Sequence, residues 1–414
     1  REEPAMHVPA YTASAALGLA LLAAGAAATE SPQFRGPNRD GVYPAEGLLQ
    51  SWPGGGPRKL WTASGLGAGF AGVTVAGGRV YTTGIRDGQG YVYALDTAGK
   101  TLWTRGYGAV HSGGGYPGSR TTPTFHDGAL YILSSAGRAV ALDAAGGEVR
   151  WQRDLASDYG ARQIQWGITE SPLVVDGKVI FTPGGRKATM VALDAENGEA
   201  VWASEATGDA SAYCSPRLLE AGTLRQIVTL TEKHLIGVDP DDGKVLWRHS
   251  HPGRYDIHAV SPLFQGRSIY VTDGYGQGGK MFELAADGRS VAVKWQDENL
   301  DVHHGGAVWV GGHIYGAAGR GTWYALDAAT GAARAEIPRA GKGSVVYADG
   351  RLYGYTEKGE VLLVDPEPAS FRVVGTLEIT EGDGHHWAHP VIAGGVLYVR
   401  HGDALVAFDV TAGE

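Results

Sequence analysis

Histidines at three points of the chain have the chemistry to bind a transition metal. His258 stands alone, whereas the others form two adjacent pairs, His303-His304 and His385-His386. Neutral imidazole is the commonest protein ligand for transition metals. Neighbouring residues on an extended chain point in opposite directions, so at most one histidine of each pair can face a common centre. We therefore predict that any metal ligands are His258, His304 and His386. The alternative is that these rings bond loop carbonyls and bridging water.

A second set of residues has the chemistry to bind a flat anionic molecule. Indole faces offer stacking surfaces, and guanidinium groups bind carboxylates through paired hydrogen bonds. The candidates are Arg120, Trp166, Arg186, Arg320 and Trp387. Since Arg120 and Arg320 are expected on the same face, they favour a small anion over a bare cation, which they would repel.

A repeated hairpin must position all of these residues. Its clearest copy is Val191 to Trp202, V-A-L-D-A-E-N-G-E-A-V-W. Val191 to Leu193 favour a strand, Asp194 can bond its own backbone to start a turn, and Asn197-Gly198 is expected to supply positive φ angles. A second strand then ends on Trp202. One such hairpin has no core in which to bury its indole, so the unit must be repeated.

The hairpin recurs in eight copies, roughly 40 to 50 residues apart, which is the period of four-stranded propeller blades. The copies begin at Ala94, Ala141, Val191, Gly237, Glu283, Ala325, Leu363 and Ala407. Between them lie pairs of apolar strands joined by short turns, such as Asp127-Gly128, Asp176-Gly177 and Gly394-Gly395. We therefore predict an all-β fold, an eight-bladed propeller of four-stranded antiparallel blades.

The two ends of the chain carry complementary parts of one blade. Arg58 to Trp61 is a fourth strand without its first three, and the C-terminus supplies three strands without a fourth. Joining them closes the ring and removes exposed sheet edges. Residues 57–414 are accordingly predicted to form a single propeller domain.

The first 56 residues are predicted to stand apart from the repeat. Residues 1–28 resemble a signal peptide, with Met6 as the start and A-A-A before Thr29 as the cleavage site. A membrane anchor is the alternative, although the apolar run is shorter than the roughly 20 residues that a spanning helix needs. Residues 29–56 are expected to pack irregularly on the propeller, with Phe34 buried and Arg35 bonding carbonyls. Trp52, outside the repeat, is expected to contribute less stability than Trp202.

Propeller topology predicts which face carries the candidate residues. The loop that leads into the first strand of each blade, called here a leading loop, opens on one face of the ring, as does the loop between the second and third strands. His258, His304 and His386 occupy the same phase of the repeat in three leading loops. We expect them, together with the candidate arginines and tryptophans, on one rim around one axis.

Charge and cysteine content narrow the choice of partners. The formal net charge of −9 argues against a nucleic-acid partner or an anionic membrane. Stable membrane insertion is not expected, and the chain is predicted to be a monomer. The single cysteine, Cys214, excludes an internal disulfide.

The A-L-D-x-x-x-G-x-x-x-W pattern resembles the tryptophan-docking repeat of the PQQ-like propeller family, over about residues 32 to 414. That family includes quinoprotein dehydrogenases, whose resemblance implies PQQ with calcium as a cofactor and an Asp as base. Glu170 and Asp273 are the only carboxylates on the predicted face that we would nominate for these roles. The disulfide of adjacent cysteines found in many quinoprotein alcohol dehydrogenases cannot form here.

The same family includes the propeller subunit of the outer-membrane assembly machine, which has the repeat but no cofactor. Because pocket chemistry and not fold decides function, we predict a non-catalytic scaffold first. It would be periplasmic or secreted, and would bind a protein partner or a small anionic ligand at the leading-loop face. No cofactor is firmly predicted. The alternative is a PQQ-dependent dehydrogenase that oxidises an alcohol or sugar.

Overall fold

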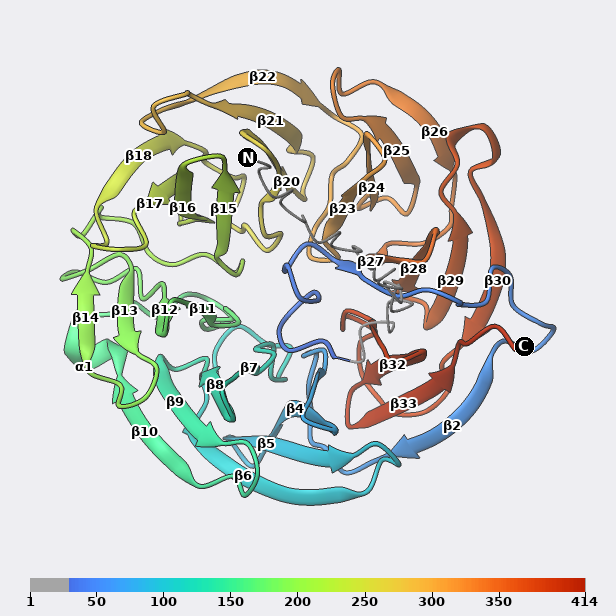
Figure 1. The fold of residues 1–414 in the computed structure, drawn as a ribbon, viewed down its shortest axis with the longest axis horizontal. Helices are drawn as coiled ribbons and strands as arrows, with labels where there is room; N and C mark the ends of the chain where they lie inside the picture. The colour runs from blue at the N-terminus through green and yellow to red at the C-terminus, as the bar shows by residue number, and fades with distance from the viewer. Residues whose placement is uncertain (1–29, 414) are drawn as a thin grey trace, which may run out of the picture.

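The protein folds as a ring of eight antiparallel sheets around a central axis (Figure 1). The computed structural model describes residues 30–413, so the predicted signal peptide at 1–28 lies outside the described residues. Within the described range the only helical segments are α1 (Leu155–Tyr159) and the single turn η1 (Pro368–Ser370). The predicted all-β eight-bladed propeller is confirmed.

The first four blades follow one another along the chain, each with its strands in sequential order. Blade 1 is β3 (Thr74–Ala76), β4 (Arg79–Arg86), β5 (Gln89–Asp96) and β6 (Thr101–Ala109). Blade 2 is β7 (Thr124–His126), β8 (Ala129–Leu133), β9 (Arg138–Asp143) and β10 (Val149–Asp154). Blade 3 is β11 (Leu173–Val175), β12 (Lys178–Phe181), β13 (Val191–Asp194) and β14 (Ala200–Ala203). Blade 4 is β15 (Arg217–Ala221), β16 (Leu224–Leu230), β17 (His234–Val238) and β18 (Val245–Ser250).

The remaining blades complete the circle. Blade 5 is β19 (Leu263–Gln265), β20 (Ser268–Asp273), β21 (Gly278–Leu284) and β22 (Val291–Asp297). Blade 6 is β23 (Ala307–Val310), β24 (His313–Ala317), β25 (Trp323–Asp327) and β26 (Ala333–Ile337). Blade 7 is β27 (Gly343–Ala348), β28 (Arg351–Thr356), β29 (Glu360–Asp365) and β30 (Arg372–Glu378). Blade 8 is β31 (Val391–Ala393), β32 (Val396–His401), β33 (Ala404–Asp409) and β2 (Arg58–Ala63).

Blade 8 contains strands from both ends of the chain. The N-terminal strand β2 pairs antiparallel with β33, with Lys59 opposite Phe408 and Trp61 opposite Ala407. Figure 1 shows β2 in blue beside β33 in red at the rim. The predicted ring closure is therefore confirmed. The most degenerate repeat copy, which begins at Leu363, lies in β29 and forms its own blade.

One blade differs from the expected four strands. Blade 7 has a fifth strand, β1 (Val42–Tyr43), which pairs in parallel with the innermost strand β27, Val42 opposite Tyr347. The inner edge of a blade's first strand has free backbone groups, and here the N-terminal segment satisfies some of them. The sequence contained no strand signal at Val42–Tyr43, because two residues carry no periodicity.

The turns form as the residue types require, with one exception. Asp194 Oδ1 accepts hydrogen bonds from the backbone N–H groups of Glu196 (2.9 Å) and Asn197 (3.1 Å). Only Gly198 has a positive φ, 73°, so the expectation that Asn197 shares it was wrong. The hairpin uses a bulge, seen as a register shift in β13–β14, instead of a two-residue turn. By contrast Asp127-Gly128 has positive φ at both residues, as a tight hairpin demands.

The repeat tryptophans connect neighbouring blades. Trp151 donates its indole N–H to Ala195 O (3.0 Å) and Trp202 donates to Pro240 O (3.1 Å), each in the turn of the next blade. Each ring also covers the turn glycine of that blade. A Cβ on Gly198 would lie 2.6 Å from the Trp151 ring, so this position cannot hold a larger residue. The Trp and Gly of the repeat therefore act across the blade junction, not within one hairpin.

Trp52 does not differ from the repeat tryptophans in burial. It is 8% exposed, the same as Trp202, and packs on Tyr353 and Gly375 of blade 7. The smaller contribution to stability predicted for Trp52 therefore cannot come from lower burial, because the segment around it folds into the largest apolar cluster.

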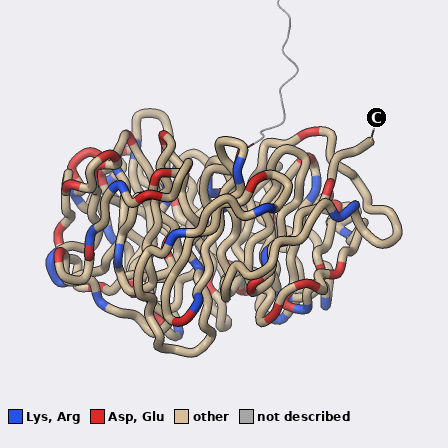
Figure 2. The backbone as a smooth tube through the Cα atoms, turned by 90° about the horizontal axis from the view of Figure 1, so that it is seen from below, with Lys and Arg blue, Asp and Glu red and all other residues tan. Residues whose placement is uncertain are grey.

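Charged residues are distributed without separation by sign in the edge-on view. Figure 2 shows basic and acidic positions interspersed along the rim and both faces of the ring. None of the helices in residues 30–413 is both long enough and apolar enough to span a membrane.

Candidate functional site

A cavity of about 460 Å³ opens where leading loops of several blades converge on the axis. We call it the cup. Its walls are mainly aromatic, from residues that are far apart in sequence, namely Phe70, Tyr116, Trp166, Tyr213, Tyr275 and Trp387. Tyr116 and Tyr275 are 49% and 37% exposed, so the mouth of the cup presents aromatic surface to solvent.

The other end of the channel is filled by residues 31–41, which we call the plug. The blue N-terminal segment crosses the centre of the ring in Figure 1. Arg35 donates hydrogen bonds to Ala307 O (2.6 Å) and Val345 O (3.2 Å) on two inner strands. Arg39 donates to Ser171 O (2.6 Å), beside a third blade. These arginine N–H groups bond backbone carbonyls at the inner edges of the blades, where no neighbouring strand pairs with them. Hydrogen bonds therefore hold the plug in the channel.

The plug also makes the floor of the cup. Phe34 lines the cavity and meets the ring of His389 edge-on, with centroids 5.1 Å apart. The predicted carbonyl bonds of Arg35 are confirmed. Phe34, however, is only half-buried and not fully buried as expected, because its outer face borders the cavity.

Trp387 is the centre of the aromatic wall. Its ring lies 5.0 Å from Phe70 and 5.2 Å from Tyr116, and it stacks on His385 at 4.2 Å with planes 7° apart. Its ring centroid also lies 5.5 Å from that of His304. Such a packed wall is pre-formed, so a flat ligand can stack on it without first ordering side chains.

A chain of hydrogen-bonded polar groups also lines the cup. Lys342 Nζ lies 2.8 Å from Glu357 Oε1 and 2.9 Å from His303 Nδ1. Since an ammonium group only donates, His303 accepts at Nδ1, and a neutral ring then carries its proton on Nε2. That nitrogen lies 2.6 Å from Tyr275 Oη, which therefore accepts and keeps its own hydroxyl proton free. The cup thus offers a hydroxyl donor that has no other assigned bond.

Burial and charge set the protonation of this chain. Burial, with the nearby charge of Lys342, lowers the pKa of His303 to about 3, so the ring is neutral. Burial tends to raise the pKa of Glu357, but hydrogen bonds from His304 (3.0 Å) and Lys342 outweigh it and lower the pKa to about 2. The carboxylate is ionised, and both contacts are made by the same oxygen, Oε1. Glu357 is the only carboxylate among the described residues that line the cavity.

Four of the eight nominated residues line the cup. They are Arg120, Trp166, His304 and Trp387. Arg120 donates to the carbonyl oxygens of its own loop, Tyr116 (2.8 Å) and Gly118 (3.1 Å), and lies over Phe70. Trp166 donates to Gly114 O (2.8 Å). These two side chains therefore hold the leading loops in shape as well as forming the wall.

The other four do not reach the cavity. Arg186 and Arg320 are exposed in loops between second and third strands. His386 bonds Tyr355 Oη through Nδ1 (2.5 Å) and stacks on His401 at 3.7 Å. His258 is wholly buried behind the wall. The structure does not bring His258, His304 and His386 together as three ligands of one ion.

The two nominated carboxylates are buried outside the cavity lining. Glu170 accepts from the N–H of Thr182 (3.1 Å), and burial raises its pKa to about 7. Asp273 is held between His251 and His258, at 2.6 Å and 2.9 Å. Neither lines the cup, so these two residues do not fit the calcium site or the base that the resemblance implies.

Tyr275, Glu357 and His251 were not singled out from the sequence. Tyr275 lies in a stretch whose glycines indicated only a loop, and Glu357 follows a strand without any motif. His251 directly follows β18 and belongs to no motif. A search for titratable residues near strand ends would have included all three, although it would not have ranked them.

Comparisons with known proteins agree with this architecture. A family model described as outer membrane protein assembly factor BamB matches residues 88–337. The quinohemoprotein alcohol dehydrogenase ADH IIB of Pseudomonas putida is 29% identical over 181 residues, 38% of this chain and 25% of that protein. The outer membrane protein assembly factor BamB of Bordetella pertussis is 28% identical over 266 residues, 62% of each. The matches thus span between 25% and 62% of these relatives' own lengths.

Solved structures show the same ring. BamB from Moraxella catarrhalis superimposes with a TM-score of 0.64 at 15% identity, covering 86% of this chain and 98% of that one. The quinohemoprotein alcohol dehydrogenase from Comamonas testosteroni gives 0.66 at 14% identity, covering 94% and 82%. At such identities the likeness shows the fold alone.

Proposed function

Because this chain belongs to the family of outer membrane protein assembly factor BamB, we propose that it is a non-catalytic binding propeller. It holds an anionic aromatic group in the cup, either on a small molecule or on a segment of a partner protein. The proposal rests on the state of Glu357, the only carboxylate among the described residues that line the cup. Its Oε1 lies 2.8 Å from Lys342 Nζ and 3.0 Å from His304 Nε2. With its pKa lowered to about 2, this carboxylate is too weak a base for general-base catalysis near neutral pH, and the adjacent ammonium group of Lys342 repels a hard cation from it.

The chemistry of the ligand follows from what the cup leaves unpaired. The wall around Trp387 and Phe70 supplies stacking faces, and Tyr275 retains a hydroxyl donor. Arg120 and Lys342 outnumber Glu357, so the lining carries a net positive charge when its histidines are neutral. An aromatic group with a carboxylate satisfies all three features.

We place the protein outside the cytoplasm, periplasmic or secreted, as a monomer. Residues 29–56 serve as an N-terminal segment and residues 57–414 as the propeller domain. The apolar run before Thr29 and the outer-membrane assembly role in the name of the matched family support export. Met6 is the start of the signal peptide in this proposal.

A fluorescence titration tests the binding role. Trp166 and Trp387 line the cup, so an aromatic carboxylate should quench the indole emission of the purified protein in a saturable way, whereas its amide should not. The variant Lys342→Met should weaken the binding, and Arg186→Ala, outside the cup, should not. Equal titration curves for the acid and its amide would contradict the assignment of an anion site.

The competing function is a PQQ-dependent dehydrogenase, which the similarity to quinohemoprotein and quinoprotein alcohol dehydrogenases supports. Trp166 and Trp387 could stack on a quinone, and Arg120 could pair with its carboxylates. The one carboxylate among the described lining residues, Glu357, is already paired with Lys342, whose charge repels calcium. Protein exported from cells supplied with PQQ and calcium should therefore show no quinone absorbance and no alcohol-dependent dye reduction. Copurified quinone together with dye reduction would replace the binding proposal by the enzymatic one.

A further inference from the structure

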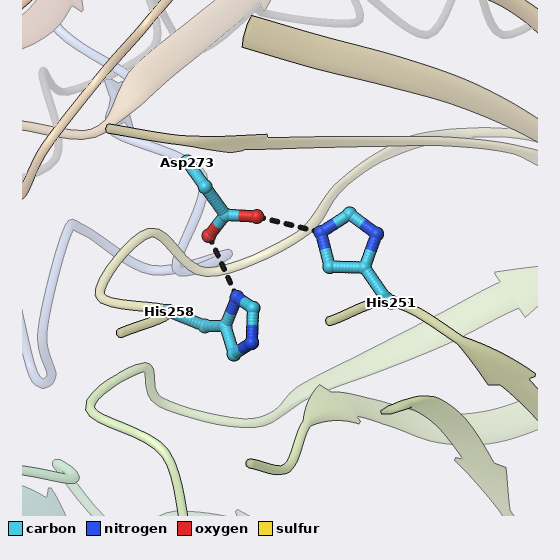
Figure 3. A group of neighbouring side chains, drawn as sticks. All are labelled: His251, His258 and Asp273. Carbon is cyan, nitrogen blue, oxygen red and sulfur yellow. Dashed lines mark hydrogen bonds and ion pairs between the residues drawn. The ribbon is translucent and has the colours of Figure 1, made fainter. Parts of the chain in front are cut away.

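Three buried side chains meet at the junction of blades 4 and 5 (Figure 3). His251 follows β18, His258 lies in the leading loop of blade 5, and Asp273 ends β20. Their exposed fractions are 4%, 0% and 3%. Their ligand atoms lie within 4.8 Å of one another, and no other group of three or more His, Cys, Asp or Glu in residues 30–413 does so.

The cluster offers four donor atoms. His251 Nε2 lies 2.6 Å from Asp273 Oδ2, and His258 Nδ1 lies 2.9 Å from Asp273 Oδ1. Figure 3 shows the two rings approaching the carboxylate from different sides, each facing its own oxygen. Two imidazole nitrogens and a carboxylate that can bind through both oxygens form an N₂O₂ set, which suits zinc and neighbouring divalent transition metals.

The hydrogen bonds of His258 limit what can lie between its ring and Asp273. His258 Nε2 lies 3.1 Å from Glu232 O. A carbonyl oxygen only accepts, so Nε2 carries the proton, and in the neutral ring the lone pair of Nδ1 points at a carboxylate oxygen. Two acceptors at 2.9 Å repel each other unless a cation lies between them. A bond from the remote ring nitrogen to a backbone carbonyl is also the usual support of a metal-ligating histidine.

We propose that His251, His258 and Asp273 bind one divalent transition-metal ion, zinc in the first instance. The ion takes the lone pair of His258 and neutralises a carboxylate that pairs with no lysine or arginine of residues 30–413. The present distances are those of hydrogen bonds, so each histidine nitrogen must move away from its carboxylate oxygen by roughly 0.4 to 0.7 Å to admit metal bonds of roughly 2.0–2.2 Å in tetrahedral geometry. The rival occupant is a proton on His258 Nδ1, which gives an imidazolium–carboxylate pair.

The site has a structural consequence for the cup. Ile257 and Ala259, on either side of His258, line the cavity. An ion bound to His258 therefore fixes this stretch of the wall and ties the end of blade 4 to blade 5. The proposal does not depend on the identity of the ligand in the cup.

Metal analysis of the full chain tests the site. Protein without a polyhistidine tag, equilibrated with zinc and then freed of excess by gel filtration, should retain one zinc per chain by mass spectrometry. Cobalt(II) should replace it and give visible d–d absorption. Asp273→Asn should abolish both signals. The matched control is Asp209→Asn, because Asp209 pairs with a single histidine, His234, at 2.6 Å, and this variant should keep the zinc.

A second variant covers the case in which Asp273→Asn does not fold. His251→Gln leaves the pair of His258 and Asp273 intact and should fold, but lower the zinc affinity by more than about 100-fold in competition with a chromophoric chelator. Zinc-free wild-type protein after equilibration would overturn the proposal in favour of the proton. Equal zinc affinity in wild type and His251→Gln would overturn it as well.

Discussion

Tryptophan has two different roles in this molecule, one between blades and one in the cup. Trp202 is 8% exposed, donates its N–H to the next blade and covers a glycine there. Trp387 is half-buried, stacks on His385 and presents its remaining surface to the cavity. The first position is repeated around the ring and the second occurs once. Repetition therefore marks the residues that hold the blades together, and the unrepeated aromatics mark the site.

The largest effect is expected for a tryptophan between blades. Trp202→Ala should lower the free energy of unfolding by about 3 to 5 kcal/mol, because a large buried ring and its hydrogen bond are lost together. Urea denaturation monitored by circular dichroism measures this. Trp52→Ala is the matched comparison, since Trp52 is equally buried but its indole N–H has no partner among the described residues. The decrease in the free energy of unfolding should be smaller for Trp52→Ala than for Trp202→Ala by about 1 kcal/mol.

The pH dependence of stability tests whether the wall behind the cup excludes water. Glu170 lies between two residues that line the cavity, and burial raises its pKa from 4.5 to about 7. Between these values the unfolded chain is ionised while the folded protein remains protonated, so stability falls as pH rises. The loss levels off above pH 7 and amounts to about 3 kcal/mol.

Glu170→Gln should remove that dependence. Urea unfolding of both proteins at pH 4.5, 5.5, 6.5 and 7.5 would show the variant gaining stability relative to wild type across the series. A constant difference would mean that water reaches Glu170 and that the wall of the cup is less dry than the junctions between blades.

A smaller loss of stability is expected for the tryptophan that lines the cup, Trp387. Trp387→Ala should cost only about 1 kcal/mol, since the ring is half-buried and its loss opens an existing cavity. Affinity for an aromatic carboxylate should fall by roughly ten-fold, the value of one lost stacking partner. Thermal denaturation and a calorimetric titration measure the two quantities. Should Trp387→Ala destabilise as much as Trp202→Ala, the distinction between the two roles would fail.

The smallest effects should come from the arginines outside the cavity. Arg186→Ala and Arg320→Ala remove exposed side chains, so stability should change by no more than about 0.5 kcal/mol and ligand affinity should not change. The same titration as for Trp387→Ala checks this. A marked loss of affinity in Arg320→Ala would extend the site beyond the cup.

Local chemistry explains why the fold could be predicted from the sequence. A turn such as Asp127-Gly128 needs positive φ angles that few residues adopt, and the Asp194 side chain bonds to the backbone within three residues of itself. Ring closure was also predictable, because the unmatched strand at Arg58 could pair only with the incomplete C-terminal blade. Each of these inferences depends on residues that are close in sequence or on a repeat that can be counted.

Which residues line the cup depends on the paths of the loops, and the sequence does not give those paths. Glu357 and Arg320 both lie between the second and third strands of their blades, yet only Glu357 reaches the cavity, where its N–H bonds to Lys342 O (2.7 Å). The repeat phase gives the face of the ring but not the distance from its axis. The tertiary structure alone showed that His258 faces Asp273 and His251 instead of the axis, since that choice arises from contacts between separate blades.

The sequence by itself therefore determined the ring, its closure and the face on which the candidate site was expected. The tertiary structure decided which side chains meet there, that the plug forms the floor of the cup, and that three other groups form a buried cluster behind it. The physical reason is the range of the interactions. Turns and strand periodicity arise within a few residues, whereas the cup and the buried cluster arise from side chains that meet only after the ring has closed.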